Sequence, residues 1–184
     1  MLDEDIIKQC IEGNRTAQEK LYNFYAPKMK GICVRYARSV VEAEDIFQDG
    51  FVKIFTNLKK YRNQGSFDGW VRRIIVNTAI DAYKANISMK NNVPYEELPE
   101  TENTSIDIDD TLDEQELLNI VSKLPDGYRV VFNLYAIEGY SHKEIADMLN
   151  ISEGTSKSQL SKARRTIQNT LYPYSHKSND TGTI

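Results

Sequence analysis

The sequence predicts an all-α protein of two small helical domains joined by an acidic flexible linker, with a helix-turn-helix in the C-terminal domain. Apolar residues recur at helical spacing, and no β-type alternation appears in the N-terminal half. Between the two helical parts, residues 91–113 contain eight acidic residues, two prolines and no lysine or arginine. That composition is typical of a linker without a packed core. A chain of 184 residues is long enough for two such domains.

Composition excludes several classes of protein. A hydrophobic content of 40% and a charged content of 27% are normal for a soluble globular protein. The N-terminus has no apolar signal-peptide core, and no apolar run is long enough to span a membrane. Cys10 and Cys33 have no CxxC spacing, which argues against a disulfide framework or a zinc site. We therefore expect a cytoplasmic protein with reduced thiols.

The net charge of −4 is unevenly distributed along the chain. Residues 1–90 contain 15 basic and 11 acidic residues, whereas residues 114–171 contain seven of each. The acidic excess therefore lies in the linker, and both predicted domains can present basic surfaces. No nucleophile–base pair, glycine-rich phosphate loop or metal-ligand cluster is visible. We expect neither an enzyme nor a cofactor, and no small-molecule substrate.

The first predicted helices lie at residues 3–12 and about 16–38, separated by a break at 13–14. Pro27 interrupts the second pattern, which allows a kink or a break into two helices there. The repeating apolar face of this second helix consists of Leu21, Tyr25, Met29, Ile32 and Tyr36.

The next predicted helix, residues 42–60, has two contrasting faces. Its buried stripe consists of Ala43, Phe47, Phe51, Ile54 and Leu58. On or beside the opposite face lie the polar residues Glu44, Asp45, Gln48 and Asp49. Such a face is either simply solvated or a docking surface for a partner protein. Gly50 lies inside this helix, where glycine lowers helix stability by about 1 kcal/mol relative to alanine.

A polar loop is predicted at residues 61–68, followed by a helix at 69–84. One face of that helix carries aromatic, cationic and amide side chains: Trp70, Arg73, Asn77 and Lys84. Its opposite side is expected to consist of Val71, Ile74, Ile75 and Ala82. Bases of a single strand can stack on aromatic rings while cations follow the phosphates, so this combination indicates a nucleic-acid surface. Trp70 taken alone is better explained as a core residue.

The C-terminal domain, residues 114–171, is predicted to contain four short helices. The first two lie at 114–124 and 128–137. Ser141 and Glu144 fit a capping box at the start of the third, and Ser152 is an N-cap candidate for the fourth.

The fourth helix buries one apolar face: Leu160, Ala163, Ile167 and Leu171. Its other faces are basic, and no acidic residue occurs from 154 through 179. The pair of helices forms a predicted helix-turn-helix whose second helix faces the DNA major groove. An ordinary helical hairpin with a solvated basic face is the alternative. The tail, residues 172–184, is expected to fray.

Together these motifs closely resemble a bacterial RNA polymerase sigma factor of the extracytoplasmic-function (ECF) group of the sigma-70 family, in its smallest two-domain form. The likeness covers nearly the whole chain. AEDIFQDGFVKIF resembles the family's helix that binds core polymerase. YRNQGSFDGWVRRIIVNTAIDAYK resembles the segment that melts and reads the −10 promoter element. LPDGYRVVFNLYAIEGYSHKEIADMLNISEGTSKSQLSKARRTI resembles the domain that reads the −35 element.

The resemblance implies roles for individual residues. Docking on core polymerase would involve Asp45, Gln48, Asp49 and Phe51. The −10 element, with one base flipped from the stack, would be bound by Tyr61, Asn63, Gln64, Gly65, Ser66, Phe67, Trp70, Arg73 and Asn77. The −35 major groove would be faced by Lys157, Ser158, Gln159, Ser161, Lys162 and Arg165.

Four positions depart from the family pattern. Gln159 occupies a place where arginine is common, and Ser156 one where an apolar residue usually packs inward. Tyr135 stands where a basic residue is frequent, and Gly50 is atypical of the docking helix.

The resemblance also implies an organisation and a set of partners. Residues 1–90 would be a region 2-like domain, 91–113 the linker, and 114–171 a region 4-like domain. The partners would be core RNA polymerase, promoter DNA and an anti-sigma factor. In our secondary hypothesis the anti-sigma factor is membrane-bound and covers residues 44–51 and the helix-turn-helix.

Two other classes of protein fit part of the sequence. A helix-turn-helix regulator that binds duplex operators without polymerase would need a dimerisation or ligand-sensing domain in residues 1–90. The aromatic and cationic stripe from Trp70 to Lys84 argues against that. A helical enzyme with a basic groove would need an acid/base constellation, which is not visible.

Overall fold

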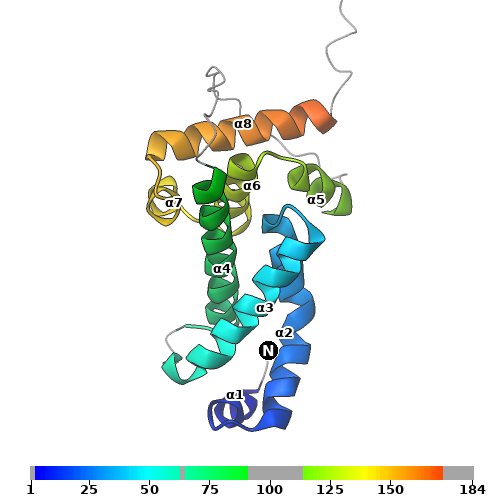
Figure 1. Ribbon diagram of the computed structural model, residues 1–184, viewed down its shortest axis with the longest axis vertical. Helices are drawn as coiled ribbons and strands as arrows, with labels where there is room; N and C mark the ends of the chain where they lie inside the picture. The colour runs from blue at the N-terminus through cyan, green and yellow to red at the C-terminus, as the bar shows by residue number, and fades with distance from the viewer. Residues whose placement is uncertain (1–2, 63–64, 91–113, 172–184) are drawn as a thin grey trace, which may run out of the picture. The chain divides into compact units, whose positions relative to one another are not determined.

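A computed structural model describes residues 3–62, 65–90 and 114–171, and all regular secondary structure in these ranges is helical (Figure 1). The all-α fold class is therefore confirmed. The chain divides into two compact units, residues 1–93 and 94–184. The predicted linker, the tail and two loop residues, Asn63 and Gln64, lie outside the described residues.

No helix among the described residues has both the length and the apolar character needed to cross a membrane. The described ranges also contain no group of three or more His, Cys, Asp or Glu side chains placed to hold a metal ion.

In its described residues, unit 1 contains four α-helices: α1 (Glu4–Ile11), α2 (Arg15–Tyr36), α3 (Val40–Asn57) and α4 (Phe67–Lys90). A short 3-10 turn, η1 (Leu58–Lys60), follows α3. The first three helices start at polar N-caps: Asp3, Asn14 and Ser39 each accept a hydrogen bond from a backbone N–H of the first turn. Helix α2 continues through Pro27 without a break. Its predicted apolar face is buried, with Leu21, Tyr25 and Met29 at most 1% exposed.

Helices α3 and α4 approach closely at Gly50. The predicted stripe of α3 is buried, and Gly50 is buried with it. A Cβ added at Gly50 would overlap the Cδ1 methyl of Ile75 on α4. Ile75 itself has no exposed surface, so its side chain lacks free space into which to move. The glycine therefore has a packing reason that its position in the sequence alone does not reveal.

Helix α4 begins two residues earlier than predicted, because Ser66 caps its first turn. The Ser66 hydroxyl accepts from the Gly69 N–H at 3.1 Å. The buried face of α4 consists of Val71, Ile75, Val76, Ala79 and Ile80. Ile74 and Ala82, which we expected on that face, are only half-buried. The face is rotated from the predicted one because α4 packs against both α2 and α3.

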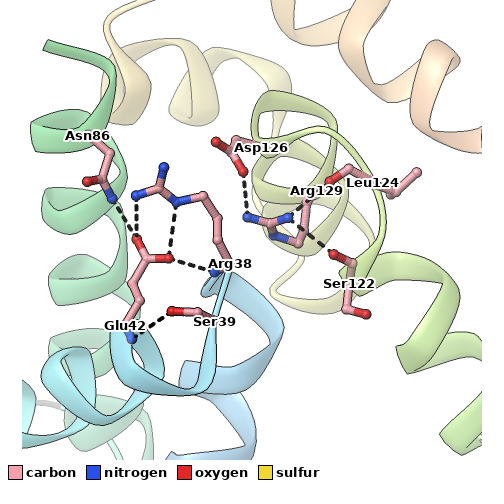
Figure 2. A network of polar contacts seen from close by, with 8 residues as sticks. All are labelled: Arg38, Ser39, Glu42, Asn86, Ser122, Leu124, Asp126 and Arg129. Atoms are coloured by element: carbon pink, nitrogen blue, oxygen red, sulfur yellow. Dashed lines mark hydrogen bonds and ion pairs between the residues drawn. The ribbon is translucent and has the colours of Figure 1, made fainter. Parts of the chain in front are cut away.

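A half-buried carboxylate, that of Glu42, joins three segments of unit 1 (Figure 2). Glu42 accepts hydrogen bonds from the Arg38 backbone N–H at 2.6 Å and from the Asn86 amide at 2.6 Å. The Arg38 guanidinium also pairs with it, at 3.2 Å. Burial alone raises the pKa of Glu42, but these hydrogen bonds and the charge of Arg38 outweigh it and leave the pKa below its ordinary value.

Unit 2 contains α5 (Glu114–Ser122), α6 (Asp126–Phe132), α7 (His142–Leu149) and α8 (Glu153–Leu171). Helix α6 continues into a π-helical turn, η2 (Asn133–Ile137). The capping box predicted at the start of α7 is present, with Ser141 and Glu144 bonded reciprocally. Helix α7 ends at Asn150, whose φ of 56° is left-handed. The predicted helix-turn-helix, α7 followed by α8, is thus confirmed as a structural element.

Arg129 closes the corner between α5 and α6 (Figure 2). Only 3% of this residue is exposed. Its guanidinium donates to the Leu124 carbonyl at 3.0 Å, to the Ser122 carbonyl at 3.3 Å and to Asp126 at 2.8 Å. The buried charge is therefore paired and also satisfies carbonyls at the C-terminal end of α5.

Candidate nucleic-acid interface

An aromatic cluster stands where the chain enters α4. The Phe67 and Trp70 rings are stacked with centroids 5.4 Å apart, and the Tyr61 ring lies 5.5 Å from that of Trp70. Phe67 is only 6% exposed and contacts Tyr25 of α2, whereas Tyr61 and Trp70 are half-buried. Phe67 thus anchors the cluster in the core, and Tyr61 and Trp70 present ring surface to solvent.

A hydrogen bond joins Tyr61 to Gly65 in front of α4. The Tyr61 hydroxyl donates to the Gly65 carbonyl at 2.9 Å. Gly65 has a φ of +89°, a left-handed conformation that glycine adopts without strain. Of the loop residues expected at the −10 element, Gly65 and Ser66 are exposed, and Asn63 and Gln64 lie outside the described residues.

Arg73 and Asn77 are exposed on the same side of α4 as Trp70. Beside them is a hollow of about 310 Å³ that Trp70 and Asn77 line from α4. Its other wall includes three residues from α3 and η1 that we did not predict: Lys53, Asn57 and Lys60. Their spacing of four and three residues places them on one helical face, and that periodicity is the signal that would have identified them.

Helix α8 presents one continuous polar face. Lys157 and Arg165 are exposed, while Ser158, Ser161 and Lys162 are half-buried. The opposite face is buried, with Leu160, Ala163 and Ile167 at most 4% exposed. Five of the six residues expected at the −35 element therefore share an accessible face.

Gln159 is the exception among those six residues. Its side-chain amide lies against Gly127 of α6, where an added Cβ would be 3.1 Å from Nε2. Its Oε1 is buried without a hydrogen-bond partner among the described residues. Gln159 packs towards α6 in this structure and does not join the polar face of α8.

The predicted docking face of α3 separates into exposed and buried residues. Asp45, Gln48 and Asp49 are exposed. Phe51, which we expected with them, is only 4% exposed and lies 4.8 Å from both Tyr22 and Phe47, measured between ring centroids. It supports α3 from the core side. An open groove of about 660 Å³ runs between α3 and α4, and Asp45, Asp49 and Asp81 line it.

Comparison with protein families gives two matches, in order along the chain. Residues 21–87 match Sigma-70 region 2, and residues 114–167 match Sigma-70, region 4. The first match contains the aromatic cluster and the predicted docking face of α3, and the second contains the helix-turn-helix.

Individual proteins align over nearly the whole chain. The ECF RNA polymerase sigma factor SigW of Bacillus subtilis is 28% identical, covering 93% of this chain and 97% of that protein. The ECF RNA polymerase sigma-E factor of Haemophilus influenzae is 24% identical, and the alignment covers 94% of this chain and 97% of that protein. Among solved structures, CnrH in complex with the cytosolic domain of CnrY has a TM-score of 0.50 and 21% identity. The structural alignment covers 94% of this chain and 99% of the chain in that structure. The two proteins therefore share a fold.

Proposed function

This chain belongs to the ECF group of the sigma-70 family, and we propose that its two units read two promoter elements for core RNA polymerase. The chain is a sigma factor that directs the polymerase to promoters for transcription initiation. One observation carries this conclusion: models of both sigma-70 regions match in order, in a chain that aligns over 93% of its length with an ECF factor. A duplex-binding regulator that works without polymerase is not favoured.

The assignment of the −35 element to α8 rests on its charge and accessibility. Lys157 and Arg165 are exposed on α8, which has no acidic residue after Glu153. Helix α7, which precedes α8, begins with a capping box. A helix of this diameter fits the major groove, where side chains can reach base edges. Serine hydroxyls at 158 and 161 lie on the same face and can bond either to bases or to phosphates.

The assignment of the −10 element rests on the aromatic cluster. Tyr61 and Trp70 offer partly exposed rings on which unpaired bases can stack, and Arg73 and Asn77 lie beyond them on α4. Capturing unpaired bases in this way offsets the cost of unstacking the duplex. Strand opening by capture is a binding process and requires no catalytic group. We include Lys53 and Lys60 in this surface as contacts to phosphates.

Docking on core polymerase would make these two weak DNA sites effective together. The exposed acidic face of α3, with Asp45 and Asp49, is our proposed docking surface. Holding both DNA readers on one platform raises their effective affinity without new DNA contacts. We also propose that residues 1–90 form the region 2-like domain, residues 91–113 the linker and residues 114–171 the region 4-like domain. The proposed location of the protein is the cytoplasm.

An anti-sigma factor is the proposed negative regulator. It would cover the α3 face at residues 44–51 and the helix-turn-helix, the two surfaces that the active protein needs. A membrane-bound factor of this kind would keep the chain from polymerase until it is released. Purification of the chain from unstressed cells without any bound partner would contradict this part of the proposal.

The function is tested by mixing the purified chain with core RNA polymerase and a library of randomised promoters. We expect stable binding to core polymerase and transcripts that start from a defined subset of sequences. Absence of core binding would overturn the proposed function. Binding of the chain alone, as a dimer, to symmetric duplex sites would instead favour the regulator without polymerase.

A further inference from the structure

Four polar or aromatic side chains meet between the helices of the helix-turn-helix. His142 begins α7, and its Nδ1 lies 2.9 Å from the hydroxyl of Ser156 on α8. The His142 ring is stacked on that of Tyr135 from η2, with centroids 4.6 Å apart and planes inclined by 22°. The Arg164 guanidinium of α8 lies over the Tyr135 ring, 5.8 Å from its centroid. We call these four residues the His142 cluster.

The His142 cluster contains Ser156 and Tyr135, two of the four residues at which the resemblance implies a departure from the family pattern. In the structure, these two residues are the partners of the same imidazole. Ser156 has no exposed surface, so its hydroxyl needs a partner within the protein, and His142 is that partner.

A hydrogen bond at this position constrains α8 more narrowly than an apolar contact would. Apolar packing tolerates small rotations, whereas a hydrogen bond weakens steeply as its angle changes. Ser156 immediately precedes Lys157 and Ser158, which point to the accessible side of the same turn. A rotation of α8 that broke this hydrogen bond would also change the direction in which the side chains of Lys157 and Ser158 point.

We infer that His142 is a positioning residue for duplex reading: by bonding Ser156 and stacking on Tyr135, it fixes the rotation of the first turns of α8. That rotation sets how Lys157 and Ser158 face the base pairs. The inference rests on the proposed function, because it concerns the accuracy with which α8 reads the −35 element.

The surroundings keep the imidazole neutral. Burial lowers the pKa of His142, and the charges of Lys157 and Arg164 lower it further, against a smaller opposite effect of Glu153. These three α8 residues contribute to the electrostatic surroundings of the imidazole, and the Tyr135 ring of η2 is stacked on it. At neutral pH the ring can therefore either accept from or donate to Ser156, depending on its tautomer.

The test measures how well holoenzyme discriminates between promoters. A promoter selected by the wild-type holoenzyme is compared with the same promoter carrying a scrambled −35 element, and the ratio of transcripts is determined. Ser156→Ala removes the hydroxyl, and His142→Phe keeps a ring on Tyr135 but removes the nitrogen. We expect each to lower the ratio about fivefold, the effect of one lost hydrogen bond. The double variant should be no worse than either single variant.

Two further variants separate positioning from general stability. His142→Asn keeps a polar atom near the position of Nδ1 and should restore most of the ratio. Thr166→Ala removes an exposed α8 hydroxyl that bonds only within its own helix, and should leave the ratio unchanged. Thermal unfolding of each chain is measured in parallel, and Ser156→Ala keeps the test valid if His142→Phe does not fold.

Three outcomes would overturn the inference. The first is that Ser156→Ala shows the wild-type ratio of transcripts, and the second is that a variant loses transcription equally from both promoters. The third is that the double variant lowers the ratio by the product of the two single effects. A wild-type holoenzyme that shows no promoter-specific transcription would instead overturn the proposed function.

Discussion

At the scale of single residues, the structure shows why certain side chains are where they are. Gly50 is unfavourable for the helix propensity of α3, yet it allows Ile75 of α4 to occupy the space that a side chain would fill. Phe51 belongs to the same helix as the exposed residues of the proposed docking face, but is itself buried. Gln159 lies between residues of the polar face of α8 and turns towards Gly127. In each case the role depends on what the neighbouring helix places opposite the residue.

Replacing Gly50 by alanine should destabilise unit 1. Overpacking a filled core costs about 1–3 kcal/mol, and the better helix propensity of alanine recovers up to about 1 kcal/mol of that. We expect a net loss of up to about 2 kcal/mol, measured by urea unfolding followed through Trp70 fluorescence. Gly31→Ala is the matched control, because Gly31 is an exposed helical glycine with nothing within 4 Å of an added Cβ. Equal stability of the two variants would contradict the packing explanation.

At the scale of elements, the contacts between helices are polar as well as apolar. Glu42 ties the start of α3 to Asn86 in the last turns of α4, residues that are 44 positions apart in sequence. Arg129 ties α5 to α6 in the same manner within unit 2. Hydrogen bonds are more directional than apolar contacts. We therefore expect the bonds of Glu42 and Arg129 to affect the angle between helices more than the burial of their apolar faces.

Glu42→Gln should lower the stability of unit 1 at neutral pH by about 1–2 kcal/mol, since charge-assisted hydrogen bonds are lost. The pKa of Glu42 is lowered in the folded chain from its ordinary value of 4.5. The stability that it contributes is therefore present above pH 4.5 and is lost as the pH falls through the lower, folded pKa. The difference between wild type and variant, measured by urea unfolding from about pH 7 downwards, should shrink in that window. A constant difference across the range would argue against the charged form as the cause.

Helix α8 should contribute to DNA affinity chiefly through charge. Lys157→Gln should reduce the slope of log affinity against log salt concentration by about 1, because one fewer counterion is released. The affinity of holoenzyme for a selected promoter, measured over a series of salt concentrations, checks this. Lys20→Gln removes an exposed lysine of α2 in the other unit and should leave the slope unchanged. An unchanged slope for Lys157→Gln would remove this residue from the DNA-binding face.

At the scale of the whole molecule, the two proposed DNA-reading surfaces belong to separate compact units. The net charge of −4 opposes DNA binding by the free chain, although both units carry basic faces. We therefore expect polymerase to be needed to bring both proposed surfaces to one promoter. This division of labour predicts that the two sites contribute independently to initiation.

Trp70→Ala should reduce strand opening at the −10 element about tenfold while leaving the −35 contacts intact, since stacking is worth about 1–3 kcal/mol per base. Lys157→Gln should weaken promoter binding without a separate effect on opening. The double variant should show the product of the two effects, because distant sites act additively in free energy. Permanganate reactivity of −10 thymines and protection of the −35 duplex measure the two steps. Trp70→Phe, which retains a stacking ring, should recover most of the opening.

Local patterns determined most of the architecture of this protein. The helical periodicity from Leu21 to Tyr36, the stripe from Ala43 to Leu58 and the Ser141–Glu144 capping box all depend on residues a few positions apart. The sequence therefore sufficed to predict them, and with them the helix-turn-helix and the exposed basic face of α8. The likeness to the sigma-70 family is spread over several such local motifs, so the amino-acid sequence alone carries it.

Which residues of a helix face a neighbouring helix, and which side chains they contact on it, depends on the tertiary packing. Gly50 with Ile75, Glu42 with Asn86 and His142 with Ser156 are pairings between separate elements. Helical periodicity defines a face but not the rotation at which a neighbouring helix covers it. That rotation depends on all the side chains that interlock at the contact, so the pairings emerge only when the helices are packed together.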